Sequence, residues 1–157
     1  MTISLAATII RSPPMYLVDT NVISEARKGL RADPGVRSFW AEVIAENTPV
    51  FLSSITIGEI RRGIDLIRHR GDDVQAQRLE AWLQQVLHDY AHRVLVLDAD
   101  AAQLWGRLRV PNPQHALDKQ IAAIARLHNL TVVTRNTADF AGTGVRLVNP
   151  FSTGKNG

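Results

Sequence analysis

The sequence predicts a single α/β domain in three layers, with a central parallel sheet of about five strands flanked by helices. Short apolar, β-prone runs recur along the chain, and each is followed by a segment with apolar residues at helical spacing. The 157 residues suit one domain with a substantial core. The apolar runs fall far short of the ~20 residues that a membrane-spanning helix needs. We find no internal repeat and no linker that would divide the chain.

The strands are expected to be short, and all their carboxyl ends meet at one edge of a parallel sheet. The third expected strand shows little alternation and is therefore predicted to be buried on both faces. The five expected strands cover residues 16–18, 50–52, 94–97, 130–133 and 145–148.

Helices are expected between the strands, because apolar residues recur there at spacings of three and four. The third and fourth helices flank a charged turn at residues 69–73 and are predicted to form a protruding αα-hairpin. The helix that precedes the fourth strand is apolar through Leu117 and Leu127 as well as through its central residues. The expected helices cover residues 21–29, 34–44, 55–67, 74–90, 99–108 and 116–128.

Composition limits the classes of function. The chain has no cysteine, which excludes disulfides and thiolate metal sites and fits a reducing cytoplasm, where we expect the protein. The net charge of +3 suits a polyanionic partner as well as an ordinary basic surface. We expect residues 1–14 to form a poorly ordered N-terminal extension, residues 15–151 the folded domain, and residues 152–157 a flexible tail.

Four acidic residues follow or precede strands at positions that can share one sheet edge: Asp19, Glu59, Asp118 and Asp139. Carboxylates brought together repel one another and raise each other's pKa unless a cation is bound. Oxygen ligands favour Mg²⁺, with Mn²⁺ as an alternative, over zinc. A metal held in this way orients a phosphodiester and lowers the pKa of the attacking water.

Each acid also has a structural interpretation. Asp19 can cap the helix that follows it, and Glu59 with Thr56 fits a capping box. Asp118 can favour the positive end of its helix, and Asp139 can stabilise a turn. Four independent caps at one edge is the less economical account, because a single acidic pocket explains all four positions at once.

Histidines offer a second type of metal site. His88 and His92 are four residues apart and could share a helix face with Asp89 nearby, but no third ligand has suitable spacing. His115 lies three residues before Asp118 and could line the acidic pocket. Glu25 lies one helical turn beyond Asn21, where a solvated helix position is the simpler interpretation.

Four sequence blocks, at residues 16–25, 52–63, 117–123 and 131–140, resemble in order and spacing those of PIN-domain nucleases. The similarity is to VapC-type toxins of type II toxin–antitoxin systems, and within them to the FitB-like branch. The resemblance implies a three-layer PIN-like fold. It also implies that Asp19, Glu59 and Asp118 hold the metal, that Asp139 is a fourth acid of the site, and that three polar residues position these groups. The positioning residues are Asn21, Thr134 and Asn136.

The family resemblance further implies Mg²⁺-dependent hydrolysis of RNA, with a 5′-phosphate on the product. It implies a homodimer neutralised by a cognate antitoxin, with DNA contacted only through that antitoxin and no role for a membrane. The alternative is a FitB-like regulatory partner of a DNA-binding antitoxin, with little nuclease activity of its own. The acids at Asp19, Glu59 and Asp118 favour the enzyme.

Two surfaces are expected to bind partners. Arginines close in sequence to the acids are candidates for phosphate contacts, although each could equally be a solvated helix residue. These are Arg27, Arg61, Arg62 and Arg135. The hairpin is the expected antitoxin surface, because it carries more apolar residues than a lone protrusion can bury. These are Ile64, Ile67, Leu79, Trp82 and Leu83.

Two other phosphoryl-transfer folds also place an Asp at a strand end. A haloacid-dehalogenase-like phosphatase needs a second Asp two residues after the first, where this chain has Asn21. A receiver domain needs a lysine after a late strand, where Thr134 and Arg135 stand. Both interpretations are therefore weaker than the PIN-like one.

Overall fold

A computed structural model describes residues 13–152 of the chain. It contains a five-stranded parallel sheet with the order β3-β2-β1-β4-β5, which confirms the expected fold class. Most of the expected N-terminal extension and all but one residue of the expected tail lie outside the described residues. The strands are β1 (Tyr16–Val18), β2 (Val50–Ser53), β3 (Val94–Leu95), β4 (Thr131–Val133) and β5 (Leu147–Val148).

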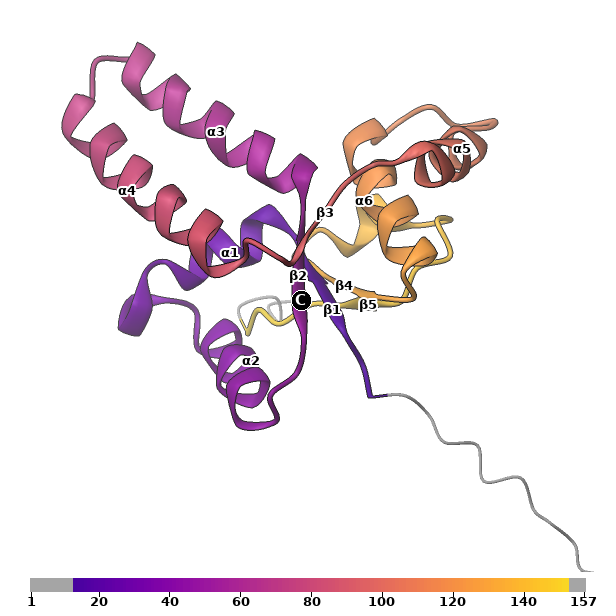
Figure 1. The fold of residues 1–157 in the computed structure, drawn as a ribbon, viewed down its shortest axis with the longest axis horizontal. Helices are drawn as coiled ribbons and strands as arrows, with labels where there is room; N and C mark the ends of the chain where they lie inside the picture. The colour runs from indigo at the N-terminus through magenta and orange to yellow at the C-terminus, as the bar shows by residue number, and fades with distance from the viewer. Residues whose placement is uncertain (1–12, 153–157) are drawn as a thin grey trace, which may run out of the picture.

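Six α-helices connect the strands, and two short 3₁₀ turns follow α1 and β4. Figure 1 shows α1 to α4 on one side of the sheet and α5 and α6 on the other. Across the described part of the chain, no helix combines the length and apolar character needed to cross a membrane. The helices are α1 (Thr20–Ala26), α2 (Pro34–Ala45), α3 (Ser54–His69), α4 (Asp73–Asp89), α5 (Ala99–Leu108) and α6 (Ala116–Leu127), and the 3₁₀ turns are η1 (Gly29–Arg31) and η2 (Thr137–Phe140).

Successive side chains of a strand point to opposite faces of the sheet, so the core is divided into two clusters, one on each face. In β1, Val18 packs with α1 to α4, whereas Leu17 packs with α5 and α6. In β4, Val133 and Val132 divide between the two clusters in the same way. Both faces of the central strands are therefore covered, as the expected three layers require.

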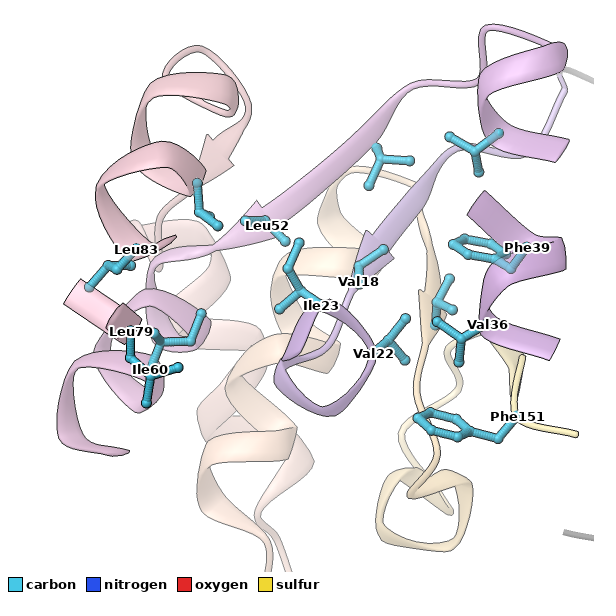
Figure 2. Packing of buried hydrophobic residues seen from close by; sticks show 14 of the residues in the cluster. Val18, Val22, Ile23, Val36, Phe39, Leu52, Ile60, Leu79, Leu83 and Phe151 are labelled. Atoms are coloured by element: carbon cyan, nitrogen blue, oxygen red, sulfur yellow. The ribbon is translucent and has the colours of Figure 1, made fainter. Parts of the chain in front are cut away.

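The αα-hairpin of α3 and α4 extends away from the sheet (Figure 1), but its base belongs to the core. Ile64, Leu79 and Leu83 are buried in the cluster that contains Leu52 of β2, as Figure 2 shows for Leu79 and Leu83. The expected antitoxin surface is therefore wrong for these three residues, because the core buries them. Ile67 and Trp82 are only partly buried.

Two other expectations are wrong in detail. Strand β3 lies at the edge of the sheet and is only half-buried, because no strand within residues 13–152 pairs with its outer side. Leu117 and Leu127 of α6 are 50% and 44% exposed, although the pattern predicted that they pack in the core. The buried arc of α6 instead includes the charged residue Lys119.

A hydrogen-bonded clamp joins the chain after β5 to the start of α2. The Asp33 carboxylate caps α2 by accepting from the backbone N–H groups of Gly35 and Val36 at 2.8 and 3.2 Å. It also accepts from the backbone N–H and the hydroxyl of Ser152, at 2.9 and 3.0 Å. The expected flexible tail began at residue 152, so the tail boundary is wrong for Ser152.

The clamp predicts an acid-dependent loss of stability. Burial opposes ionisation of Asp33, but the hydrogen bonds from Ser152, Val36 and Gly35 outweigh it and lower its pKa from 3.8 to about 2. This stabilisation is complete above the unfolded-state pKa and is lost as the pH falls through about 2. We expect Asp33→Asn to unfold at lower urea concentration than the wild type at pH 7, with the difference shrinking between pH 4 and pH 2. A constant difference over that range, measured by urea unfolding, would contradict this account.

Candidate functional site

Asp19 follows β1 directly and is 4% exposed, at the carboxyl edge of the sheet. Its Oδ1 accepts from the backbone N–H of Thr20 at 2.8 Å, so it caps α1 as one sequence interpretation proposed. Its Oδ2 accepts from the Thr134 hydroxyl at 2.8 Å and from the Asn21 amide at 3.3 Å. The carboxylate is therefore fixed by three donors, two from the start of α1 and one from the chain after β4.

The groups around Asp19 are themselves held in place. The Asn21 amide nitrogen also donates to the Thr134 hydroxyl at 3.3 Å, and its oxygen accepts from the backbone N–H of Arg135 at 3.0 Å. The backbone N–H of Asn136 donates to the Thr134 hydroxyl at 3.1 Å. The side chains of Thr134 and Asn21 thus fix the Asp19 carboxylate, whereas Asn136 contributes through its backbone.

Three more carboxylates act on this region electrostatically. Burial and the charge of Asp19 raise the pKa of Glu59, against the opposing charge of Arg62. Burial and the charges of Asp19, Asp139 and Glu59 raise the pKa of Asp118 from 3.8 to about 6, although His115 opposes the shift. Asp118 therefore lies within electrostatic reach of the other three acids predicted from the sequence.

The structure also decides between capping and clustering for Glu59. The N-cap of α3 is Ser53, whose hydroxyl accepts from the backbone N–H of Thr56 at 3.1 Å. Glu59 therefore lies beyond the cap, and the proposed capping box with Thr56 is wrong. Its charge interacts with that of Asp19.

His115 brings a nitrogen ligand to the acidic cluster. Its Nδ1 lies 3.9 Å from Asp118 Oδ2 and 3.7 Å from Asp139 Oδ1. These three side chains form the single group of candidate metal ligands found within residues 13–152. The alternative zinc site is wrong, because α4 ends at Asp89 and His92 lies outside the helix.

The four arginines that were candidates for phosphate contacts lie in different surroundings. Arg61 is paired with Glu80 of α4 at 2.6 Å and with Asp65, so it joins the two hairpin helices and its expected phosphate contact loses support. Arg62 is exposed and close enough to Glu59 to lower its pKa. The remaining two contact aromatic rings: the Arg27 guanidinium lies over Trp82 and that of Arg135 over Phe151.

Glu25 is not a solvated helix acid. Its carboxylate accepts from the backbone N–H of Asp33 at 2.9 Å and pairs with Lys28 at 2.6 Å. The Lys28 hydrogen bond, followed by that of Asp33, lowers the Glu25 pKa. Glu25 therefore joins α1 to the start of α2 rather than facing the acidic cluster.

A family model described as the PIN domain matches residues 16–144, which contain the whole acidic cluster. The chain belongs to the PIN-domain family. It is 38% identical over 145 residues to the toxin FitB of Neisseria gonorrhoeae, a match that covers 87% of this chain and 99% of FitB. It is 33% identical to the VapC ribonuclease Y4jK of Sinorhizobium fredii, a match that covers 87% of this chain and 98% of that relative.

Solved structures agree with this assignment. The crystal structure of FitAcB from Neisseria gonorrhoeae contains a chain that is 36% identical, with a TM-score of 0.69. The match covers 87% of this PIN domain and 98% of the FitAcB chain. A structure of FitAB bound to a DNA fragment gives the same TM-score at 34% identity, over 87% of this chain and 95% of that one.

The hydrogen-bond network of this PIN domain predicts a large effect of Thr134→Val. Valine keeps the shape but removes the donor to Asp19 and the acceptor for Asn21 and Asn136, so the carboxylate loses its fixed orientation. On the ribonuclease function proposed below, we expect RNA cleavage to fall about 10- to 100-fold, the usual effect of removing such a supporting contact. Steady-state cleavage assays measure it.

The matched control for this prediction is Thr143→Val. Thr143 is equally buried, and its hydroxyl donates to the carbonyl oxygen of Phe140 at 2.6 Å, away from Asp19. Both variants are expected to lose about 1–3 kcal/mol of stability. Equal cleavage by the two variants would mean that Thr134 has only a structural role.

Proposed function

We propose that this PIN domain is the toxin of a toxin–antitoxin pair and hydrolyses RNA phosphodiester bonds with Mg²⁺. The observation that carries the proposal is the gathering of acids around Asp118: burial, followed by the charges of Asp19, Asp139 and Glu59, raises its pKa to about 6. Such repulsion is retained in proteins where a cation relieves it. The similarity to a relative named as a VapC ribonuclease supports the same reaction.

The donor set fits a hard divalent cation. Asp19, Glu59 and Asp118 would hold Mg²⁺ through oxygen, and Asp139 would add a fourth acidic oxygen at the rim. His115 makes Mn²⁺ an acceptable substitute, since imidazole suits transition metals better than it suits Mg²⁺. When bound, the metal polarises the phosphodiester and lowers the pKa of the attacking water.

The protein's own side chains supply orientation and charge. Thr134 and Asn21 hold the Asp19 carboxylate in one rotamer, so this ligand needs little rearrangement on metal binding. Arg62 is exposed beside Glu59 and is the arginine best placed to contact RNA phosphates, whereas Arg135 binds Asn21 through its backbone N–H and directs its guanidinium over Phe151.

We place the antitoxin in a pocket of about 240 Å³ between α1 and the hairpin. Its walls include the partly buried Trp82 and Ile67, with Arg27 over the Trp82 ring, and it extends to Glu59. A segment bound there would reach the acidic cluster and block RNA. The proposal includes a homodimer, and its test is the mass of the free protein and of the antitoxin complex in solution.

A second candidate function is regulation through a DNA-binding antitoxin with little nuclease activity. The similarity to a chain in the structure of FitAB bound to DNA favours it. The two candidates differ in one measurement. A nuclease cuts RNA without the antitoxin, whereas a regulatory partner only changes how the antitoxin binds DNA.

The deciding experiment is incubation of the antitoxin-free protein with total RNA and Mg²⁺, followed by sequencing of the RNA ends. We expect defined new ends with 5′-phosphates, no cleavage with EDTA, and no cleavage by Glu59→Gln. Cleavage that survives both EDTA and Glu59→Gln would come from a contaminant. Absence of cleavage by the wild type under any divalent cation would favour the regulatory function.

A further inference from the structure

An open pocket of about 620 Å³ lies beside the acidic cluster on the side of α6. Its walls come from the loop before α6, the start of α6 and the segment around η2. His115 and Asp139 belong both to the pocket and to the candidate metal-ligand group. Any occupant of the pocket is therefore adjacent to the groups that would act on a phosphodiester.

A buried lysine lines this pocket. Lys119 is only 6% exposed, and its ammonium donates to the carbonyl oxygen of Asn112. Among residues 13–152, no carboxylate lies within 4.0 Å of this ammonium, although an ammonium has three donors. A cation that is taken out of water without a paired charge is costly, so its presence in the wall favours an anionic ligand.

The loop that Lys119 anchors carries neutral polar groups. Asn112 and Gln114 are exposed at the pocket, and both offer a side-chain amide that can donate and accept. Val110 and Pro111 add apolar surface on the same loop. Unstacked RNA bases are recognised by hydrogen bonds to their edges together with packing against aromatic or apolar side chains.

We propose that this pocket binds the nucleotide next to the scissile phosphate of the RNA. Lys119 contacts the phosphate of that nucleotide, and Asn112 and Gln114 read its base. The inference rests on the proposed ribonuclease function and adds to it a subsite that sets sequence preference. A single RNA strand can reach both the pocket and the acids, because its neighbouring nucleotides are covalently joined and the two sites share His115 and Asp139.

The first test uses Lys119→Met, with Arg146→Met as the matched control. Both variants lose one positive charge. Arg146, however, lies at the amino end of β5, whereas the acids lie at the carboxyl ends of the strands, and its guanidinium donates to the Asn129 side chain. The probe is a fluorescein-labelled single-stranded RNA of mixed sequence, with Ca²⁺ replacing Mg²⁺ to suppress cleavage. Fluorescence anisotropy gives its Kd over a range of salt concentrations.

We expect Lys119→Met to raise Kd about tenfold and to reduce the slope of log K against log salt by about 0.7, the value of one phosphate contact on a single strand. Lys119→Arg retains the charge and is expected to retain the slope. The control is expected to change neither quantity by a comparable amount. Equal behaviour of Lys119→Met and Arg146→Met would overturn the inference.

The second test keeps the inference falsifiable if Lys119 variants fail to fold. Gln114 is exposed, so Gln114→Ala leaves the core intact. With Mg²⁺, sequencing of RNA ends is expected to give a weaker base preference at one position flanking the cut. An unchanged preference together with active cleavage would reject the subsite and leave the ribonuclease function standing, whereas a wild type that cuts no RNA would reject the function itself.

Discussion

Replacing Asp118 by Asn is expected to abolish RNA cleavage and, in the absence of metal, to make the protein more stable. The activity loss follows from removing a ligand that would hold the metal, and a thousandfold decrease corresponds to roughly 4 kcal/mol of barrier. The stability gain follows from repulsion, because burial and the charges of Asp19, Asp139 and Glu59 all oppose the ionised form of Asp118. Few substitutions of a polar residue are expected to stabilise a protein, so the sign is diagnostic.

The pH dependence of this gain follows from the direction of the pKa shift. The pKa of Asp118 is about 6 in the folded protein against 3.8 as the ordinary value. Ionisation therefore destabilises the folded state, with no effect below pH 4, a growing effect between pH 4 and pH 6, and the full effect above pH 6. Allowing for partial solvent screening, we expect a gain of about 1–2 kcal/mol at pH 7.5, or a rise in Tm of roughly 2–8 °C.

Thermal unfolding in EDTA at pH 4 and pH 7.5 measures this effect. Glu42→Gln is the matched control, because it removes one negative charge from an exposed position in α2. Mg²⁺ is expected to stabilise the wild type increasingly above pH 6 and to have little effect on Asp118→Asn. Lower stability of Asp118→Asn than of the wild type in EDTA at pH 7.5 would mean that the carboxylates are not crowded.

The same argument does not extend to Asp19, although the sequence alone would extend it there. The Asp19 carboxylate already accepts from Thr20, Asn21 and Thr134. In Asp19→Asn, one carboxylate oxygen becomes an NH₂ group. If this group replaces Oδ2, it faces the donors Thr134 and Asn21; if it replaces Oδ1, the backbone N–H of Thr20 loses its acceptor and α1 loses its cap. The loss of these bonds offsets the relief of repulsion. Asp118 gives the cleaner test, because the described residues supply no such donor to its carboxylate.

The sequence was sufficient to predict a residue's position where a pattern reflects a single physical requirement. A short apolar run that ends in Asp19 fixes a strand and its carboxyl end, and parallel strands bring such ends to one edge. The same reasoning identified Glu59, Asp118 and Asp139 as neighbours of Asp19 before the fold was known. These positions depend on topology, which the strand–helix alternation strongly restricts.

The sequence was insufficient to predict burial or charge pairing where these depend on residues that are close in space but distant in the sequence. Leu117 and Lys119 are two residues apart in α6, and periodicity assigns the leucine to the core, yet the lysine is buried and the leucine exposed. Glu25 and Arg61 looked like free surface charges because their partners, Asp33 and Glu80, are 8 and 19 residues away. A charged side chain shows its pairing only when the elements that carry both partners are placed.

Replacing Gly35, in the first turn of α2, by Ala is expected to destabilise the fold strongly. A Cβ at this position would lie 2.1 Å from the carbonyl oxygen of Pro150 and 2.8 Å from the backbone nitrogen of Ser152. Both are backbone atoms, so relief requires movement of the whole C-terminal segment rather than of a flexible side chain. That movement separates Ser152 from Asp33 and breaks the clamp. We expect a loss of about 2–3 kcal/mol and a fall in Tm of roughly 4–12 °C.

Gly106→Ala provides a control with the opposite expected sign. Gly106 lies in the last turn of α5, and nothing lies within 4 Å of the position that its Cβ would take. Alanine there is expected to raise stability by about 0.5–1 kcal/mol, because it favours the helix and restricts the unfolded chain. Guanidinium unfolding of both variants therefore separates the close backbone approach at Gly35 from a general effect of adding a methyl group.

The combination of Gly35→Ala with Asp33→Asn tests whether the close approach and the clamp are one structural unit. If alanine at position 35 already separates Ser152 from Asp33, then neutralising Asp33 removes fewer interactions in the double variant. We expect the two losses of stability to be less than additive by at least ~0.5 kcal/mol. The acid-dependent part of stability is expected to shrink in Gly35→Ala as well, because the bonds that lower the Asp33 pKa include those from Ser152. Full additivity, with an unchanged acid response, would mean that the C-terminal segment relaxes around the new methyl group while keeping its bonds to Asp33.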